Sequence, residues 1–445
     1  MTMTSFAPLT ATVKSLTSIT KSGFASGTGG NMINVKGLSD VARVGDFVRI
    51  SPGKDETVLG EVLSLTPEHI CVLPEKGTSG LSLNDRVDYL GTADIAPDKS
   101  WLGRIIDPFG RPLDDAPLMK GAQLRSVLAN PPAAAQRGRL GPRLETGIAA
   151  FNTFLPIVRG QRVGLFAGSG VGKSTLLANL SKGIDADFVV IALIGERGRE
   201  LREFVEDTLG PEGLKKACII AATSDQSPMV RRRAAWTAMA VAEYFRDHGG
   251  HVLFLADSVT RFAEAHREIA VAAGEAASAR NFPPSTSQMI MSLCERAGPG
   301  IEGTGDISAV LSVLVSGSDM DEPIADIVRG VLDGHVVLDR QIAERGRFPA
   351  IDVLRSVSRS LPNAASDIEN TALMKARDLM SRYAEAELMI QAGLYSDGND
   401  PLIDAAIEAR PKLEAVLAAG NGITTEDSFK RLTKAIKPTH HPIRA

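Results

Sequence analysis

Hydrophobic and polar residues follow three successive patterns along the chain. In the first, from about residue 34 to residue 90, short apolar or alternating stretches such as 46–50 and 61–65 stand between Gly, Pro and Asp residues. Several short strands at such close spacing are typical of a small barrel. The stretch 130–137 contains paired prolines, which block both a helix and a central strand, so it predicts a linker.

The second pattern, from about residue 141 to residue 360, consists of fully apolar stretches that alternate with helical ones. The apolar stretches are residues 163–166, 188–194, 217–222 and 252–256. A strand that is apolar on both faces must be covered on both faces, so this pattern predicts a mostly parallel sheet with helices on either side. The fold class of this part is therefore α/β.

The third pattern is helical and begins after Leu361 and Pro362. Apolar residues recur there at helical spacing before Gly393, a residue type that commonly ends helices; they are Leu373, Ala376, Met380, Tyr383, Ala386 and Ile390. We therefore expect, in chain order, an N-terminal arm over residues 1–20, a small β-barrel domain over 21–95, a connecting segment over 96–140, an α/β domain over 141–360 and a helical domain over 361–445.

Composition and charge exclude several classes of protein. The 445 residues are 44% hydrophobic and 23% charged, as in an ordinary folded soluble protein. With 49 basic and 53 acidic residues, the net charge of −4 gives no overall field that attracts nucleic acid or an anionic membrane. The first 20 residues lack the pattern of a secretory signal, and nowhere do about 18 apolar residues follow one another. We therefore expect a cytoplasmic protein.

The cysteines and a run of three arginines are both explained without a metal site or a nucleic-acid-binding site. The cysteines, Cys71, Cys218 and Cys294, are widely spaced and form no C-x-x-C pair, so we interpret them as reduced, buried thiols. The run Arg231-Arg232-Arg233 is either a nucleic-acid-binding patch or a solvated helix face. The net charge and the absence of interleaved aromatic residues favour the solvated face.

The strongest chemical signal is a glycine-rich loop that follows the apolar stretch 163–166. Its sequence, AGSGVGKS, fits G-x-x-x-x-G-K-[ST] except that Ala stands in the first position. Glycines let backbone N–H groups curl around phosphate oxygens, and the helix N-terminus adds a favourable dipole. Lys173 would then neutralise the β and γ phosphates of a bound nucleotide, and Ser174 would bind Mg²⁺. The predicted nucleotide-binding residues of this loop are Ala167, Gly168, Ser169, Gly170, Val171, Gly172, Lys173, Ser174 and Thr175.

Two carboxylates follow apolar stretches of the predicted sheet. Asp257 comes directly after 252–256, where a phosphate-loop core needs a water-mediated contact to Mg²⁺. Glu196 comes shortly after 188–194, at the strand ends where open α/β sheets bind ligands. It is therefore placed to polarise a water in line with the γ-phosphate. The alternative is a solvated Glu196 that the dipole favours near a helix start.

Together, these motifs resemble those of the hexameric rotary-type ATPases, and specifically the flagellum-specific ATPases of the type III protein export apparatus. The resemblance covers nearly the whole chain. It implies a RecA-like phosphate-loop core with a mostly parallel sheet, preceded by a small N-terminal β-barrel and followed by a helical C-terminal domain. It also implies an Mg²⁺-dependent ATPase that acts as a homohexamer. Besides the residues already named, it rests on PPS at 283–285, DGH at 333–335, FPAID at 348–352 and SVSR at 356–359.

The resemblance implies roles for individual residues. Glu196 matches the catalytic glutamate that activates water, and Arg197 a neighbouring active-site arginine. Arg359 matches the arginine finger that reaches into the adjacent subunit's site. Phe348 matches an aromatic residue that packs against adenine, the alternative being a plain core residue. One segment departs from the family: residues 286–291 read TSQMIM where VFARLP is expected, which puts in doubt any role of that arginine.

The resemblance also implies a function in flagellar protein export, in which ATP hydrolysis drives unfolding and delivery of substrates. The expected partners are a second copy of the chain, a stator-like regulatory export protein at the N-terminal arm, export chaperones and substrates at the helical domain, and the export gate at the inner face of the bacterial inner membrane; nucleic acid is not among them. An ATPase of a virulence-type secretion system is the nearest alternative. A nucleic-acid translocase and a non-catalytic nucleotide-binding subunit are two more, against which the missing basic and aromatic surface and Glu196 argue, respectively.

Overall fold

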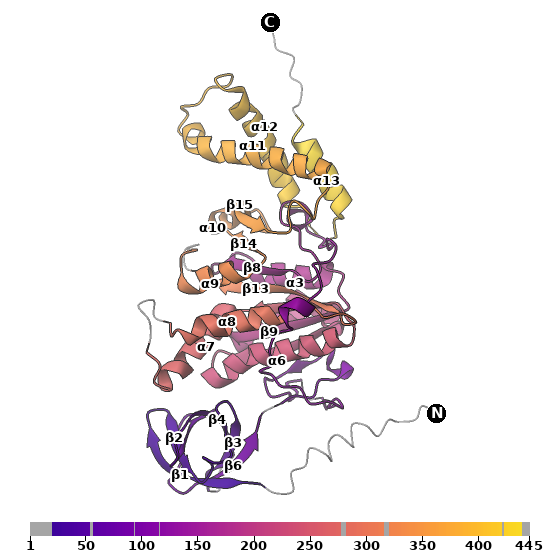
Figure 1. The fold of residues 1–445 in the computed structure, drawn as a ribbon. Helices are drawn as coiled ribbons and strands as arrows, with labels where there is room; N and C mark the ends of the chain where they lie inside the picture. The colour runs from indigo at the N-terminus through magenta and orange to yellow at the C-terminus, as the bar shows by residue number, and fades with distance from the viewer. Residues whose placement is uncertain are drawn as a thin grey trace, which may run out of the picture.

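Three parts of the molecule are stacked one on another in the computed structural model (Figure 1). A strand barrel, here the barrel domain, lies at one end, a sheet flanked by helices, the central domain, lies in the middle, and a group of helices, the helical domain, lies at the other end. The structure describes residues 20–53, 57–92, 94–114, 116–276, 282–315, 320–420 and 422–437. The predicted fold class is confirmed, whereas the predicted arm lies, except for its last residue, outside the described residues.

The barrel domain is a closed antiparallel barrel with the strand order β1-β2-β5-β4-β3-β6. Its strands are β1 (Ser22–Gly29), β2 (Met32–Lys36), β3 (Phe47–Ser51), β4 (Val58–Leu65), β5 (Ile70–Pro74) and β6 (Arg86–Gly91). Because successive side chains of a strand point to opposite faces, every second residue fills the interior. Ile33 and Val35 of β2 and Val48 and Ile50 of β3 are fully buried there.

The central sheet has the order β15-β14-β8-β13-β11-β9-β10-β7 and is parallel apart from β15 and a short strand, β12, beside β13. The strands are β7 (Ile105–Ile106), β8 (Arg162–Ala167), β9 (Phe188–Glu196), β10 (Ala217–Thr223), β11 (Val252–Asp257), β12 (Gly298–Pro299), β13 (Asp306–Leu314), β14 (Gly334–Leu338) and β15 (Ile351–Ser358). In β9, Val189 and Ile191 enter one hydrophobic core, and Val190 and Ala192 enter the core on the opposite face. Burial of both faces explains the fully apolar stretches.

Helices cover both faces of this sheet. One face carries α3 (Lys173–Gly183), and the other carries α6 (Pro228–Asp247), α7 (Val259–Ala272), α8 (Ser285–Arg296) and α9 (Pro323–Val331). The segment 286–291, which departs from the expected family pattern, lies within α8. The remaining short helices are η1 (Lys99–Trp101), η2 (Ala134–Gln136), α2 (Ala149–Asn152), α4 (Gly198–Glu203), η3 (Phe204–Leu209), α5 (Gly210–Lys215) and α10 (Arg340–Glu344).

The helical domain consists of α11 (Asp367–Gln391), α12 (Pro401–Leu417) and α13 (Thr425–Ala435). A capping box starts α11, since Ser366 and Glu369 bond reciprocally to each other's backbone N–H. The helix ends before Gly393, whose φ of 68° suits glycine, so the predicted helix and its end are confirmed. Among the described residues, none of the helices combines the length and apolar character that a membrane span requires.

Two sequence predictions are wrong. Arg232 and Arg233 of α6 are buried, 6% and 3% exposed, and therefore do not form a solvated face. Arg232 forms an ion pair with Glu61 of the barrel domain, and Arg233 donates to the Pro108 carbonyl at 2.9 Å. The partner of Arg232 is far away in sequence, so local composition gave no sign of it. Cys71 is only half-buried, whereas the other two cysteines are buried as predicted.

Candidate active site

The phosphate loop joins β8 to α3. Gly170 and Gly172 have φ values of 77° and 83°, a left-handed conformation that residues with a Cβ disfavour. Space is also limited at Gly172, because an added Cβ would lie 3.3 Å from the ring of Phe348. Helix α3 begins at Lys173, so the positive end of its dipole lies at the loop. These features suit an anion.

A cavity of about 780 Å³, here the phosphate cavity, lies beside this loop. It brings together most of the predicted site residues from the ends of β8 and β9 and the start of α3. The exception within the loop is Val171, which is 2% exposed and packs in the hydrophobic core. The predicted residues that line the cavity are Ala167, Gly168, Ser169, Gly170, Gly172, Lys173, Ser174, Thr175, Glu196 and Arg197.

Lys173 is the counter-charge for two carboxylates at the strand ends. Its Nζ forms an ion pair with Oδ1 of Asp257 and lies 3.9 Å from Oε1 of Glu196. The hydroxyl of Ser312 on β13 donates to the same Asp257 oxygen at 2.7 Å. Parallel strands end at one edge of the sheet, which is why residues far apart in sequence converge here.

The pKa of Glu196 is raised to about 7. Burial is the largest cause, and the negative charge of Asp257 adds to it, while Lys173 acts in the opposite direction. Glu200 raises the pKa further through a hydrogen bond and its charge. A carboxyl group with a pKa near 7 changes its protonation within the physiological pH range, as suits a group that handles protons or orients water.

The two predicted metal ligands, Ser174 and Asp257, both offer oxygen donors to a divalent cation. Hard oxygen ligands suit Mg²⁺, which commonly uses one or two protein oxygens together with phosphate oxygens and water. Within the described part of the chain, no group of three or more His, Cys, Asp or Glu side chains could hold a metal. A hydroxyl and a carboxylate oxygen fit an Mg²⁺ that is bound together with a nucleotide.

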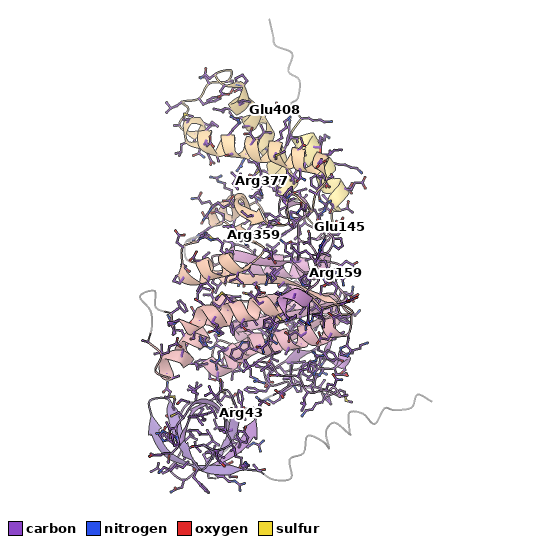
Figure 2. All side chains as sticks on the ribbon, viewed as in Figure 1. Arg43, Glu145, Arg159, Arg359, Arg377 and Glu408 are labelled. Carbon is purple, nitrogen blue, oxygen red and sulfur yellow. The ribbon has the colours of Figure 1, made fainter. Side chains whose placement is uncertain are left out.

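The other predicted residues differ in position. The side chain of Arg197 is 80% exposed and pairs with Glu200 at 3.3 Å. Phe348 is 51% exposed, next to Gly172 of the loop. Arg359 is exposed and does not line the phosphate cavity of its own chain. Figure 2 shows it at the end of the central domain that adjoins the helical domain.

Sequence reasoning missed two arginines that line the phosphate cavity, Arg231 and Arg261. Arg231 belongs to the misread arginine run and pairs with Glu268 at 2.9 Å. Arg261 lies in the first turn of α7, just after the strand that ends in Asp257, and pairs with Glu264 at 2.9 Å. The signal for Arg261 was its position, because a basic residue one helical turn after a strand end lies near the ligand-binding edge of the sheet.

Comparison with known proteins identifies two matching families. Residues 147–358 match the family described as "ATP synthase alpha/beta family, nucleotide-binding domain". Residues 365–434 match the family described as "T3SS EscN ATPase C-terminal domain".

Individual relatives match over most of their length. The chain is 43% identical to the flagellum-specific ATP synthase of Caulobacter vibrioides, over 96% of this chain and 99% of the relative. It is 41% identical to the type 3 secretion system ATPase of Pseudomonas syringae pv. syringae, over 84% of this chain and 85% of the relative. The assembled ATPase EscN of enteropathogenic E. coli, solved in complex with its central stalk EscO, superposes with a TM-score of 0.84 at 37% identity, over 93% of this chain and 100% of that chain.

Proposed function

The chain belongs to the ATP synthase alpha/beta family, and within it to the flagellum-specific and type III secretion ATPases, and on this basis we propose that it hydrolyses ATP to energise flagellar type III protein export. The observation that carries the proposal is the convergence of Lys173, Glu196 and Asp257 beside the phosphate loop. This arrangement provides a cation for phosphate, a carboxylate for water and a carboxylate for the metal. None of these roles requires a covalent intermediate.

Positioning and electrostatic stabilisation supply the catalysis. The loop and Lys173 fix the β and γ phosphates, and ionised Glu196 accepts a hydrogen bond from the attacking water and holds it in line. Ser174 and Asp257 would hold Mg²⁺, which neutralises phosphate charge when bound. Arg231 and Arg261 add positive charge to the cavity wall. Arg197 is proposed as a further active-site arginine, and Phe348 as the surface that packs against adenine.

We also propose that the site is shared between subunits of a homohexamer. Arg359 is exposed and outside its own chain's phosphate cavity, which supports a role in the cavity of a neighbouring copy. There it would stabilise the charge that develops in the transition state, a contribution worth roughly 10³- to 10⁵-fold in rate. The assembled state described for EscN supports the same arrangement.

The remaining partners are proposals from the family. A stator-like regulatory protein would bind residues 1–20, and export chaperones and substrates would bind the helical domain. The protein would act in the cytoplasm, peripherally at the export gate. The ATPase of a virulence-type secretion system is the second candidate, because a relative of that kind is 41% identical against 43% for the flagellar one.

Steady-state ATP hydrolysis across a wide range of protein concentration tests the enzyme and its assembly together. We expect specific activity to rise with concentration, to require Mg²⁺, and to fall at least about a hundredfold in Glu196→Gln and Arg359→Ala. Mixing inactive Glu196→Gln with inactive Arg359→Ala should restore part of the activity, because some interfaces then combine an intact Glu196 with an intact Arg359. A protein that binds ATP without turnover at any concentration contradicts the proposal. Motility of a deletion strain separates the flagellar candidate from the virulence-type one.

A further inference from the structure

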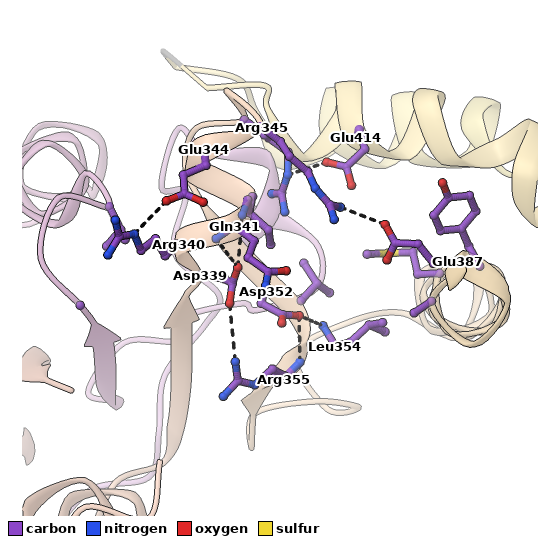
Figure 3. A pocket seen from close by; sticks show the side chains of 18 of the residues that line it. Asp339, Arg340, Gln341, Glu344, Arg345, Asp352, Leu354, Arg355, Glu387 and Glu414 are labelled. Carbon is purple, nitrogen blue, oxygen red and sulfur yellow. Dashed lines mark hydrogen bonds and ion pairs between the residues drawn. The ribbon is translucent and has the colours of Figure 1, made fainter. Parts of the chain in front are cut away.

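A second cavity, of about 1030 Å³, lies between the central domain and the helical domain. We name it the interdomain cavity (Figure 3). Gly168, Ser169 and Val171 of the phosphate loop line it, and so do Tyr383 of α11 and Glu414 of α12. The phosphate loop thus borders both cavities. A movement of the helical domain would change the shape of the interdomain cavity, which the loop also lines.

Two arginines of the central domain reach α11 and α12 across the interdomain cavity. Arg345 Nη1 lies 3.1 Å from Glu387 Oε1, and Arg347 Nε lies 2.5 Å from Glu414 Oε2. Figure 3 shows Glu387 and Glu414 extending from the helical domain toward the central domain. Charge pairs therefore link the two domains across the cavity.

The two pairs differ in burial. The side chain of Arg345 is 53% exposed and that of Glu387 is 26% exposed. The side chain of Arg347 is only 10% exposed, and that of Glu414 is 28% exposed. Exposed pairs contribute little because water screens them. The charge of a buried guanidinium, by contrast, is stabilised mainly by its counter-charge, since water cannot reach it to take the place of the partner carboxylate.

Arg347 also binds two carbonyl groups of the chain that follows Phe348. Its Nη1 donates to the carbonyl of Pro349 at 3.2 Å, and its Nη2 donates to the carbonyl of Ile351 at 2.8 Å. A guanidinium presents its donors in one rigid plane, so these contacts fix the local backbone. The ring of Phe348 borders Gly172 of the phosphate loop. One side chain thus connects α12, the segment 348–350, here the Phe348 turn, and the start of β15.

We propose that Arg347 is a positioning residue that couples the helical domain, through Glu414, to the Phe348 end of the nucleotide site. The inference rests on the proposed function, in which Phe348 packs against adenine. If α12 moves away, Arg347 loses its nearest counter-charge, Glu414, while buried, so we expect it to follow the helix or turn to solvent. Either response releases the carbonyls of Pro349 and Ile351 and with them the Phe348 turn.

This coupling acts on nucleotide affinity and leaves the chemical step intact. Lys173, Glu196 and Asp257 are held at the ends of sheet strands or at the start of α3, and the phosphate cavity that Lys173 and Glu196 line does not include Arg347. A partner that displaces the helical domain would therefore change the KM for ATP and the Kd for ADP, with little change in kcat.

The test measures kcat and KM for ATP, and Kd for ADP by calorimetry, on the full-length protein. Glu414→Gln is expected to raise KM and Kd about tenfold, which corresponds to about 1.4 kcal/mol, and to change kcat less than about twofold. Arg347→Lys keeps the charge but loses the planar fork, so its KM should lie between those of wild type and Glu414→Gln. Thermal unfolding followed by circular dichroism checks that each variant is folded.

Two control variants separate the positioning role from a general effect of charge. Glu387→Gln removes the exposed pair, and Arg410→Gln removes the other partner of Glu414, which lies 2.7 Å away. Both should keep the wild-type KM and Kd within about twofold.

The outcomes of the two proposals can be told apart. If the wild type hydrolyses ATP but Glu414→Gln and Arg347→Lys match the controls in KM and Kd, or lose only kcat, the positioning role is wrong and the proposed function stands. If the wild type binds ADP without hydrolysing ATP, the proposed function is wrong, and the Kd values alone decide the positioning role. If Glu414→Gln does not fold, Arg347→Lys against Glu387→Gln decides it.

Discussion

The central domain joins its two neighbours in different ways. Toward the barrel domain the contact is buried and charged. Arg232 and Glu61 form an ion pair there, with side chains only 7% and 9% exposed. Beside them, Arg233 lies over the rings of Phe47 and Phe109, about 5 Å from each centroid. Toward the helical domain, α12 and α13 pack against α2 and share a hydrophobic core with it, here the packed flank, while α11 and α12 also border the interdomain cavity.

We expect the two connections to respond differently to displacement, and we name the first the fixed connection and the second the articulated connection. A buried ion pair tolerates little displacement, because separating its charges leaves each without water or partner. A domain that borders a cavity over part of its interface can tilt toward or away from that cavity. We therefore expect the barrel domain to move with the central domain, and the helical domain to tilt relative to the phosphate loop.

The largest expected effect comes from breaking the fixed connection. Glu61→Ala leaves Arg232 buried without its counter-charge, and we expect it to lower the free energy of unfolding by about 3–5 kcal/mol. The measurement is urea unfolding followed by fluorescence of the two tryptophans and by circular dichroism. The matched variant at the articulated connection, Glu387→Ala, should cost less than about 1 kcal/mol, because that pair is exposed. Equal losses in the two variants would contradict the comparison.

The second prediction concerns the packed flank of the helical domain. Arg377 of α11 donates to the carbonyls of Val353 at 3.1 Å and Phe154 at 3.4 Å, and Figure 2 shows it where the two domains meet. Arg377→Ala should cost about 2 kcal/mol, since it leaves two carbonyl groups without these donors. Domain-resolved hydrogen exchange should locate the loss in α11 and leave the barrel domain protected. An even loss of protection across all three domains would contradict an articulated connection.

The third prediction is a stabilisation at the start of α8, in the central domain. Thr286 is fully buried, and its hydroxyl has no hydrogen-bond partner among the described residues. Thr286→Val keeps the shape and removes the buried polar group, so it should raise the free energy of unfolding by about 1 kcal/mol. Thr237→Val is the matched control. It should destabilise, because the Thr237 hydroxyl donates to the Pro108 carbonyl at 2.7 Å.

The sequence predicted β8, β9, β10 and β11, in which both faces are apolar, and it missed β14 and also β13, the strand in the middle of the sheet. β13 carries Ser308 and Ser312, two polar residues that interrupt its apolar pattern and are nevertheless fully buried. Ser308 accepts from the backbone N–H of Gly160, and Ser312 donates to Asp257. Their partners come from other elements, so the reason why they can be buried is not local.

The candidate site likewise contains residues that the sequence predicted and residues that it missed. The phosphate loop was readable because its glycines, lysine and hydroxyl must be contiguous for the backbone to surround a phosphate. Arg231 and Arg261 reach the phosphate cavity from separate helices, and only the packing of those helices on the sheet brings them there. Arg232 was misread for the related reason that its counter-charge, Glu61, lies in another domain.

The smallest expected effect is the absence of a change: Glu414→Gln, at the articulated connection, should leave the pH dependence of kcat/KM unchanged. The pKa of Glu196 is raised to about 7, so in the free enzyme the carboxyl is mainly protonated at pH 6 and mainly ionised at pH 8. Because the ionised form orients water, kcat/KM should rise through a midpoint near pH 7. Glu414→Gln should lower kcat/KM at every pH without moving that midpoint, because the causes of the raised pKa lie within the central domain.

Glu200→Gln provides the positive control for this measurement. Glu200 raises the pKa of Glu196 through its hydrogen bond and negative charge, so removing that charge should shift the midpoint to lower pH. If Glu414→Gln moves the midpoint as far as Glu200→Gln does, the helical domain reaches the water-activating carboxylate as well as the Phe348 turn. An unmoved midpoint with a raised KM would confine the influence of the helical domain to nucleotide affinity. A displacement of the helical domain would then change how tightly the nucleotide binds, while the residues at the strand ends of the central sheet would set the rate of the chemical step.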